Sequence, residues 1–480
     1  MSIIDGVVSA AAILFAMAAA VFPRRVACAL PVALPLLVIG CLVQWVLENF
    51  YWQMVPSYVA IVAATVLVVS RSRRTAPIRP APATMDLPAA DGTTMRRILA
   101  LVAPVAVGLL AVLAIVAWSI PPVPTLPEPS GRYRVGSQIF RWIDQQRPET
   151  ATDSTTDRRN VSVQAWYPTE FASGRQWVYL AGLGRLPSRV TRIPSFVMSN
   201  YDSIDTHAYA DVPISAERAR WPVVLFSPGY GAPRAFYTGL VTDLASRGFV
   251  VLAIDHPYEV AVTELADGTI ATPIEDFPED DADGERYMTE QLEVRRGDLR
   301  FVVDQLDRPE AIGTLAGRLD TDHIAAIGHS FGGASAVAAA ADDPRIKAAV
   351  NIDGTLYGDL PGRALQQPFL LLESDHSETG HSARYLDRNR DLIQHLRAGG
   401  FRYEIAEANH FGFTDVPLFL AAPARFAVAQ FIGGERGPVD TQRAANDILA
   451  AFLQGPLGGP AGNVPAAAER HADIHGGAVS

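Results

Sequence analysis

The chain has 480 residues, of which 49% are hydrophobic, with a mean hydropathy of +0.14 and a formal net charge of −11. This length is too great for one average domain, and the hydropathy indicates that part of the chain lies in a membrane. The acidic balance argues against a nucleic-acid partner. The two cysteines, Cys28 and Cys41, fall in apolar segments, so the rest of the chain has no disulfide to form.

Four apolar segments occupy the first 120 residues, at positions 3–22, 27–47, 55–69 and 98–120. The fourth segment contains twenty-three residues without a charge, which is enough to cross a hydrocarbon core about 30 Å thick. A cleaved signal peptide would account for the first segment alone. We therefore predict that residues 1–120 form an anchor of four transmembrane helices.

Arginine residues gather in two of the loops that join these segments. Arg24 and Arg25 separate the first two segments, and six arginines lie between residues 71 and 97, whereas the loop after the second segment carries only Glu48. Arginine-rich loops stay in the cytoplasm, and the Pro- and Ala-rich residues 75–90 are expected to form an extended cytoplasmic linker. An even number of crossings then places everything after residue 120 outside the cytoplasm, in a multi-pass protein of the cell membrane.

After a Pro-rich connector at residues 121–131, strand-like and helix-like segments alternate from residue 132 to 454. Eight strand-like runs predict a mainly parallel sheet with helices between its strands, which is an α/β architecture. From residue 455 to 480, Gly, Pro and Ala dominate, so we expect a disordered tail. The predicted strands lie at residues 133–144, 161–168, 222–226, 249–254, 323–327, 347–352, 369–373 and 402–406.

The fifth predicted strand runs directly into Gly328-His-Ser-Phe-Gly332, and Ala-rich sequence of helical character follows. Gly-x-Ser-x-Gly between a strand and a helix is the pattern of a nucleophile elbow, whose tight turn needs residues without side chains on both sides of the serine. A chance Gly/Ser loop would not explain the strand before it and the helix after it. We therefore predict an α/β-hydrolase fold with Ser330 as the nucleophile.

A serine hydroxyl needs a neighbouring base, and the base needs a carboxylate that orients it. His410 follows the last predicted strand, where this fold places the base. Asp353 follows the sixth strand and Asp375 follows the seventh. Both positions carry the acid in proteins of this fold, so the residues alone leave the choice open.

Two backbone N–H groups are needed to stabilise the oxyanion of an ester's tetrahedral intermediate. One is the N–H of Phe331, the residue after the predicted nucleophile. The turn Gly229-Tyr-Gly231 follows the third predicted strand, and its glycines allow a close backbone approach. We expect the N–H of Tyr230 to be the second donor.

The domain after residue 130 contains the stretches Gly131-Arg-Tyr-Arg-Val-Gly136, Trp166-Tyr-Pro168, Phe226-Ser-Pro-Gly-Tyr-Gly-Ala-Pro-Arg234, Asp243-Leu-Ala-Ser-Arg-Gly-Phe-Val250, Gly328-His-Ser-Phe-Gly-Gly333 and His410-Phe-Gly-Phe-Thr-Asp415. Together they resemble the plasma-type platelet-activating-factor acetylhydrolases, a serine-dependent, calcium-independent lipase family. The resemblance implies an ester hydrolase without a cofactor. It also implies that the acid follows the sixth strand, which favours Asp353 over Asp375.

Two positions depart from that family, which usually has His where Pro228 stands and commonly has Leu where this chain has Tyr230. Ser-Pro-Gly-Tyr at residues 227–230 and the downstream Asp375 also resemble the bacterial cutinase-type polyester hydrolases. Those enzymes use a Tyr at this turn and an acid after the seventh strand. A cutinase-like or general carboxylesterase is therefore the alternative function.

Residues 279–290 nearly fit an EF-hand calcium loop, but Glu279 takes its first position and Arg286 a position that is normally apolar. We expect a solvated acidic loop around Asp281 and predict no metal ion or cofactor. The long segment at residues 258–283 departs from the alternation of strands and helices, and it could form a lid.

These features predict a membrane-anchored extracytoplasmic serine esterase. Its substrate is expected to be an ester with a short or modified acyl chain, and the resemblance points to a phospholipid. The inferred partners are this ester and the membrane, with no nucleic acid and no protein partner. A non-catalytic membrane receptor or scaffold that has kept the fold is the remaining alternative, but its triad would be expected to erode, whereas Ser330, Asp353 and His410 are all present.

Overall fold

The computed structural model describes residues 3–48, 50–73, 92–120, 123–180, 195–198, 200–273, 278, 280–429 and 431–480. The contacts within the chain divide it into two compact units. The first comprises Met1–Pro122, Phe196–Asn200 and Leu420–Pro423, and the second comprises Val123–Ser195, Tyr201–Phe419 and Ala424–Ser480.

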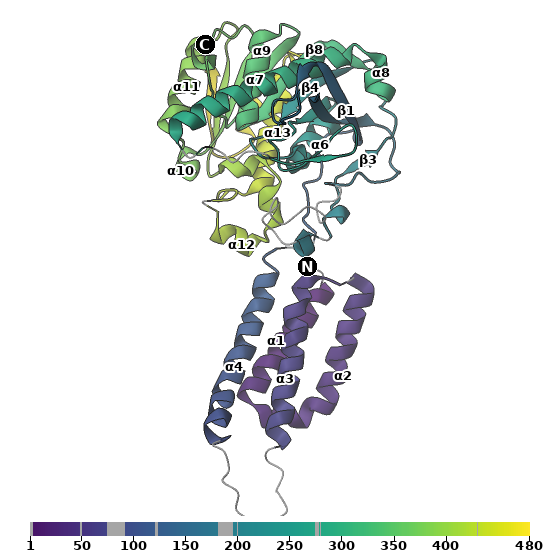
Figure 1. Cartoon of the computed structure of the whole chain (residues 1–480), viewed down its shortest axis with the longest axis vertical. Helices are drawn as coiled ribbons and strands as arrows, with labels where there is room; N and C mark the ends of the chain where they lie inside the picture. Colours follow the sequence, from purple (N-terminus) through teal and green to yellow (C-terminus); the bar gives the residue numbers. More distant parts are fainter. Residues whose placement is uncertain are drawn as a thin grey trace, which may run out of the picture. The chain divides into compact units, whose positions relative to one another are not determined.

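The first unit contains four helices, α1 (Ile3–Val21), α2 (Pro23–Glu48), α3 (Val55–Arg73) and α4 (Gly92–Ala117) (Figure 1). Three stretches are long and apolar enough to cross a membrane, namely Ile4–Val21, Pro23–Glu48 and Trp52–Ser72. In α4 the apolar stretch among the described residues is the shorter Val105–Ala117, so these residues support three crossings and the fourth stays a prediction. The predicted linker at residues 75–90 lies outside the described residues.

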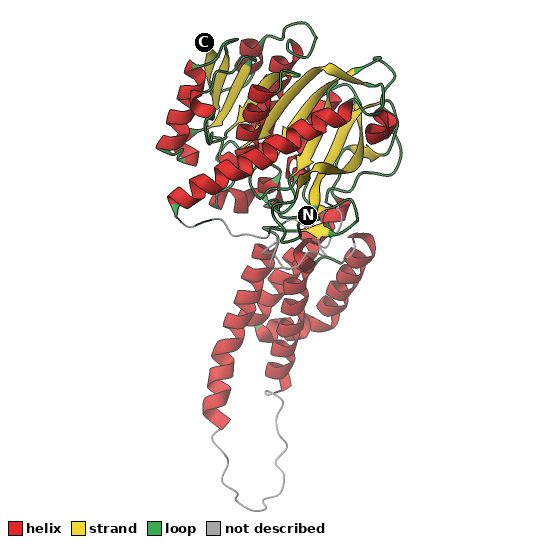
Figure 2. Cartoon of the chain, turned by 45° about the horizontal axis from the view of Figure 1, so that its top comes forward, coloured by secondary structure: helices red, strands yellow, loops and turns green. Residues whose placement is uncertain are grey.

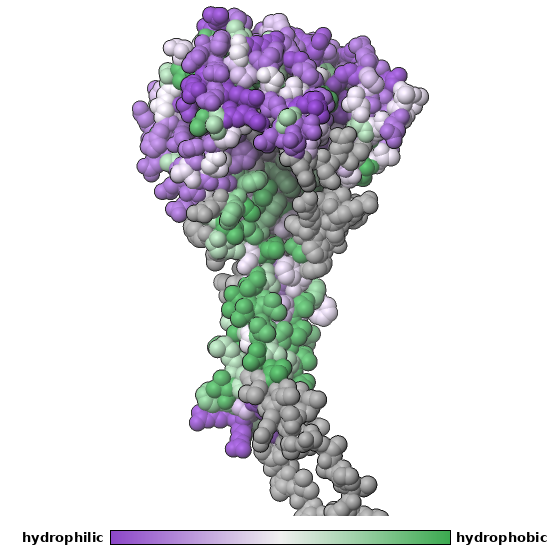
Figure 3. Space-filling model, turned by 60° about the vertical axis from the view of Figure 1, so that its left-hand side comes forward, coloured by the Kyte–Doolittle hydropathy of each residue, from purple (hydrophilic) through white to green (hydrophobic). Residues whose placement is uncertain are grey.

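The surface of this helical unit is apolar, as Figure 3 shows. Only 6% of the apolar stretch in helix α2 is buried inside the protein, and Val32, Leu36 and Ile39 are among its exposed side chains. A contiguous apolar surface of this kind is suited to contact lipid rather than water.

Asp5 is an ionisable residue inside the first apolar segment, and its environment is visible only in the structure. Its side chain is buried, and the Gln44 amide of α2 donates a hydrogen bond of 2.9 Å to its carboxylate. The Tyr58 hydroxyl of α3 donates in turn to Gln44. These bonds join three helices through polar groups, an arrangement that fixes how apolar helices align.

The second unit is built on one mixed sheet of ten strands in the order β12-β11-β10-β9-β8-β4-β5-β2-β1-β3 (Figure 2). The six neighbouring strands from β11 to β5 in this order run parallel, whereas β12 is antiparallel to β11 and β2 is antiparallel to β1 and β5. The bounds are β1 (Arg134–Pro148), β2 (Arg158–Thr169), β3 (Ala208–Ala210), β4 (Trp221–Ser227), β5 (Val250–Asp255), β8 (Leu319–His329), β9 (Ile346–Ile352), β10 (Phe369–Ser374), β11 (Gly400–Ile405) and β12 (Ile474–Val479), with a separate hairpin of β6 (Thr263–Glu264) and β7 (Ile270–Ala271).

Helices cover both faces of this sheet. In β4 every residue is buried, and its alternate side chains enter two different cores. Val223 packs with α7 and α9 on one face, and Val224 packs with α6 and α13 on the other. This burial on both faces explains the continuous apolar run in the sequence. The helices are α6 (Thr238–Ser246), α7 (Asp281–Leu306), α8 (Pro309–Ile312), α9 (Phe331–Asp342), α10 (His376–Thr379), α11 (Ala383–Gln394), α12 (Ala422–Ala427), α13 (Pro438–Gln454) and α14 (Val464–Glu469).

Short 3₁₀ turns complete the chain. They are η1 (Trp52–Met54), η3 (Ser195–Met198), η4 (Tyr201–Ser203), η5 (Arg234–Tyr237), η6 (Gly313–Leu315), η7 (Leu360–Gly362), η8 (His410–Phe413) and η9 (Val416–Phe419). Two of them matter for the site, because η5 follows the turn after β4 and η8 begins at His410.

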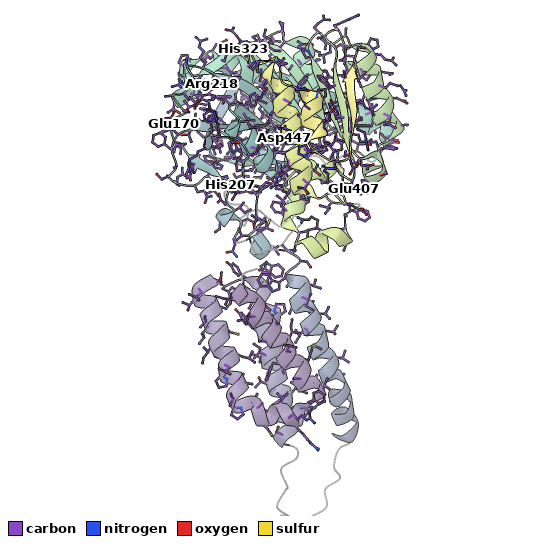
Figure 4. All side chains as sticks on the ribbon, turned by 180° about the vertical axis from the view of Figure 1, so that it is seen from behind. Glu170, His207, Arg218, His323, Glu407 and Asp447 are labelled. Carbon is purple, nitrogen blue, oxygen red and sulfur yellow. The ribbon has the colours of Figure 1, made fainter. Side chains whose placement is uncertain are left out.

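The prediction of a disordered tail at residues 455–480 is wrong, and with it the count of eight strands. All eight predicted strands occur, but α14 and β12 follow, and the short β3 adds a tenth strand at the far edge. Strand β12 pairs with β11 through its backbone, and at Gly476 a Cβ would lie 2.0 Å from the Arg402 carbonyl oxygen. The Gly-rich composition therefore permits close strand pairing here. His471 also lies 2.9 Å from Asp447 of α13, which Figure 4 labels.

The acidic segment around Asp281 is the start of α7. The Asp280 carboxylate caps this helix by accepting from the Ala282 and Asp283 N–H groups. A helix from Asp281 onward is incompatible with a twelve-residue calcium loop. Within the described ranges no group of three ligating side chains could hold a metal ion. The lid prediction at residues 258–283 falls partly outside the described residues, and its described part contains the β6–β7 hairpin.

Candidate active site

Ser330 sits in the turn between β8 and α9 with φ 55° and ψ −127°, a conformation that costs energy for any residue with a side chain. The turn is tight because a Cβ on Gly328 would lie 2.1 Å from the Gly332 carbonyl oxygen, and one on Gly332 would lie 1.9 Å from that of Ser227. Only glycine fits at both positions. The Ser330 N–H donates to the Ile352 carbonyl at 2.7 Å, which ties the turn to the neighbouring strand.

Asp353 is the first residue after β9, and it also has a positive φ of 56°. The Asn351 side chain closes the turn around it, since its amide oxygen accepts from the Gly354 N–H at 2.9 Å and its NH2 donates to the Gly354 carbonyl. The Asp353 carboxylate is buried and accepts from the N–H and hydroxyl of Ser374 at 2.9 and 2.7 Å. The turn therefore places a carboxylate that is shielded from solvent at the ends of β9 and β10.

His410 begins η8, the turn after the β11 strand, and Asn409 caps that turn by accepting from the Phe411 N–H. His410 Nδ1 lies 2.7 Å from Asp353 Oδ2. Burial alone would raise the pKa of Asp353, but the hydrogen bonds from His381 and His410 hold it well below its usual range. Asp353 is therefore charged, and Nε2 is the nitrogen of His410 left for proton transfer with a nucleophile.

Asp375, the other aspartate that the sequence left open, has a different role. It caps α10, where it accepts from the backbone N–H and hydroxyl of Ser377, and it also accepts from the Glu407 N–H at 2.8 Å. These bonds fix the loop that precedes His410. The structure thus places Asp353 against the His410 ring and Asp375 at a helix terminus.

His329, next to the nucleophile position, connects the elbow to the loop of His410. Its Nε2 lies 3.0 Å from the His410 carbonyl, and since a carbonyl only accepts, Nε2 carries the proton. Its Nδ1 accepts from the Tyr237 hydroxyl at 2.8 Å, and that hydroxyl accepts from the Gly229 N–H. Burial and the neighbouring His410 lower the pKa of His329 to about 3, so the ring stays neutral. One chain of hydrogen bonds thus joins three loops of the site.

The turn after β4 carries Tyr230, and the buried Arg295 of α7 holds that turn from behind. Arg295 donates to the carbonyls of Pro228 and Gly229, forms an ion pair with Glu259, and lies 4.6 Å over the ring of Phe331. The Arg295 guanidinium therefore contacts both the turn that carries Tyr230 and the ring of Phe331, the two residues whose N–H groups are the predicted oxyanion donors. Sequence reasoning missed Arg295, because a basic residue in a helix is ordinarily read as exposed.

A second Ser-His-Asp array lies beneath this turn. Ser227 Oγ lies 3.0 Å from His256 Nε2, and His256 Nδ1 lies 2.8 Å from Asp298, which also forms an ion pair with Arg159. All of these side chains are buried, and burial together with the charge of Arg295 lowers the pKa of His256 to about 4. No substrate can reach this serine, so the array supports the oxyanion turn from inside.

All five sequence-predicted site residues line one cavity of about 520 Å³: Tyr230, Ser330, Phe331, Asp353 and His410. Its other walls combine the aromatic rings of Tyr357, Tyr385, Phe411 and Phe431 with polar side chains. Phe411 and Phe431 are 43% and 73% exposed, so apolar rings flank the opening. The cavity therefore presents a hydroxyl, an imidazole and a buried carboxylate to a ligand with apolar surface.

Similar proteins act on esters. The structure of a ferulic acid esterase from Streptomyces cinnamoneus superimposes with a TM-score of 0.60 at 26% sequence identity, covering 74% of this chain and 99% of that one. A probable 1-alkyl-2-acetylglycerophosphocholine esterase of Arthroderma benhamiae is 27% identical, over 64% of this chain and 80% of its own length. A platelet-activating factor acetylhydrolase of Cavia porcellus is 23% identical, over 70% of this chain and 78% of its own. The protein is thus a serine ester hydrolase.

The family of this protein follows from a sequence match that covers most of the chain. Residues 121–273 and 286–459 match the family described as platelet-activating factor acetylhydrolase, isoform II, and the chain belongs to this family. The resemblance seen in the sequence is confirmed. The likeness to a ferulic acid esterase agrees with the second resemblance, to cutinase-type polyester hydrolases.

The anchoring of the oxyanion turn by Arg295 can be tested with Arg295→Lys. A lysine cannot bridge two carbonyls and Glu259 together, so we expect kcat/KM for p-nitrophenyl acetate to fall roughly ten-fold while the chain stays folded. The control is Arg296→Lys, because Arg296 pairs with Glu293 and Asp342 at the surface. An unchanged kcat/KM in Arg295→Lys would show that the turn does not need this contact.

Proposed function

We propose that this protein is a membrane-anchored serine esterase that hydrolyses carboxylic esters with Ser330, Asp353 and His410. The observation that carries the proposal is the 2.7 Å contact of His410 Nδ1 with the buried Asp353 carboxylate, in the cavity that the strained Ser330 turn also lines. This combination supplies a nucleophile, a base and an orienting acid.

His410 accepts the Ser330 proton through Nε2 as the Ser330 oxygen attacks the ester carbonyl. The N–H groups of Tyr230 and Phe331 stabilise the oxyanion of the tetrahedral intermediate, and Asp353 stabilises the imidazolium. The intermediate collapses to an acyl-enzyme as His410 protonates the leaving alcohol. Water, deprotonated by His410, then attacks the acyl group and releases the carboxylic acid and the Ser330 hydroxyl.

The sheet order supports an α/β-hydrolase fold. Numbered along the chain, the eight predicted strands occur across the sheet in the order 1-2-4-3-5-6-7-8, and only the second is antiparallel to its neighbours. The elbow follows the fifth strand, the acid the sixth and the base the eighth, which is the chain order Ser, Asp, His of this fold.

The relatives support a phospholipid with a short or modified acyl chain as substrate, since two of them are named for 1-alkyl-2-acetylglycerophosphocholine or platelet-activating factor. A general or cutinase-like carboxylesterase is the second candidate. The aromatic cavity walls around Phe331 and Tyr357 and the likeness to a ferulic acid esterase favour it. A non-catalytic receptor or scaffold would not need the Asp353–His410 contact.

For the membrane unit we propose four crossings, with α4 as the last and the catalytic domain outside the cytoplasm. The uncharged sequence of α4 after Arg97, which runs to Ala117, and the arginine distribution support this orientation. An anchor of this kind keeps the site close to lipid esters.

The identity of the acid is tested by comparing Asp353→Asn with Asp375→Asn, with Ser330→Ala as the reference for lost chemistry. An amide at residue 353 cannot stabilise the imidazolium, so we expect kcat for short-chain p-nitrophenyl esters to fall by about 10⁴. Asp375→Asn keeps an oxygen that can cap α10 and weakens only the contact with the Glu407 N–H, so it should lower kcat less than ten-fold. A larger loss in Asp375→Asn, or turnover by Ser330→Ala, would contradict the proposed chemistry.

The orientation is tested with a membrane-impermeant fluorophosphonate probe on intact cells that express the full chain. An extracytoplasmic Ser330 should label without lysis, and Ser330→Ala should not label under either condition. If native chain labels only after the cells are lysed, the catalytic domain lies in the cytoplasm and the arginine argument is wrong.

A further inference from the structure

A second histidine contacts the carboxylate proposed to orient the base. His381 Nε2 lies 2.8 Å from Asp353 Oδ1, and His410 Nδ1 lies 2.7 Å from Asp353 Oδ2. The His381 side chain is only 5% exposed, against 27% for that of His410. One buried carboxylate therefore lies between two imidazole rings.

The position of His381 is fixed by aromatic packing as well as by this contact. Its ring stacks on Tyr385 of α11 with a centroid distance of 4.1 Å and an interplanar angle of 10°. It also stacks more loosely on His376 of α10, at a centroid distance of 5.7 Å. Its Nε2 also lies 3.3 Å from the Ser374 hydroxyl. A ring held in this way cannot turn away from Asp353 without losing several contacts.

The Asp353 carboxylate has no capacity left for another strong donor. A carboxylate offers about four acceptor positions, and the N–H and hydroxyl of Ser374 and the two imidazoles occupy them. The Tyr385 hydroxyl lies further away, at 3.5 Å. His381 is thus one of the groups that fix the direction in which Asp353 faces His410.

We propose that His381 is a positioning residue that shares the Asp353 carboxylate with His410 and extends the activity of the base to lower pH. This inference rests on the proposed function, in which His410 is the base. When His381 carries a proton, its positive charge opposes a second proton on His410, because the two cations would share one carboxylate. The acid limb of the pH–rate profile therefore lies lower with His381 in place than it would with a neutral residue there.

The charges around His381 favour its protonated form. Burial opposes the proton, but the hydrogen bond and charge of Asp353, aided by Glu373 and Glu404, outweigh burial and raise the pKa of His381. The His381 ring therefore keeps its proton at pH values at which a histidine in water has largely lost it. Titratable groups surround it from every packed element: Asp353 after β9, Glu373 of β10, Glu404 of β11, His376 of α10, Tyr385 of α11 and His410 of η8. Arg402 of β11 pairs with Glu373.

The test is the pH dependence of kcat/KM for p-nitrophenyl acetate, measured on the full chain with His381→Gln. Glutamine can still donate to Asp353 but carries no charge, so we expect the acid limb to move up by about one pH unit. At high pH, where native His381 is also neutral, kcat/KM should stay within about three-fold of the native value. The matched control is His376→Gln, since His376 is exposed and stacks on His381 without contacting Asp353, and it should not move the limb.

His381→Asn is a second variant if the glutamine does not fold, and it should move the limb in the same direction. An acid limb that stays in place or moves to lower pH in the folded variants would overturn the proposal. A loss at every pH as large as that of His410→Gln would also overturn it, because His381 would then be the base. Failure of the proposed function would give a different result, because His410→Gln would then remain active. The inference about His381 is tested separately, by the pH profile of His381→Gln.

Discussion

The contact between the buried Asp353 carboxylate and His410 holds together parts of the chain that are far apart in sequence. Asp353 reaches it from the turn after β9, Ser374 supports it from the end of β10, and His410 comes from the loop after β11. A buried carboxylate is costly unless donors surround it. The four donors here offset that cost, and together they determine where the imidazole lies relative to Ser330.

A second layer of buried polar groups keeps the oxyanion turn in place behind the nucleophile. Arg295 binds the turn through its carbonyls, and the Ser227-His256-Asp298 array packs beneath it. Tyr237 and His329 connect the same turn to the loop of His410. Because each of these groups is buried and paired, displacement of one leaves another without a partner. The site is rigid for this reason, which suits a reaction that depends on preorganised donors.

Much of this arrangement could be predicted from the sequence, because it is encoded locally. The buried strands are continuous apolar runs, and the elbow requires glycine at positions 328 and 332, so both are visible in the residues. The choice between Asp353 and Asp375 could not be made from spacing, since both end a strand. It depends on the turn that Asn351 closes, and only the resemblance to a family favoured the residue that lies against His410.

The features that sequence reasoning missed depend on partners distant in the chain. Arg295 lies 67 residues from Pro228, and His381 lies 28 residues from Asp353. Asp5 finds Gln44 on another helix, 39 residues away. The tail was misjudged because β12 needs backbone pairing and little side-chain surface, which a Gly-rich sequence provides. Composition reports the propensity of a segment to stay unfolded, but not the presence of a strand edge for it to join.

The central claim is that Ser330, and no other serine, is activated for attack on an acyl or phosphoryl centre. Peptide mapping by mass spectrometry after treatment of the native full chain with a fluorophosphonate tests it most directly. We expect one adduct per chain, on Ser330, with none on Ser227 of the buried array. An adduct on another serine, or a folded chain that takes up no label, would show that Ser330 is not the nucleophile.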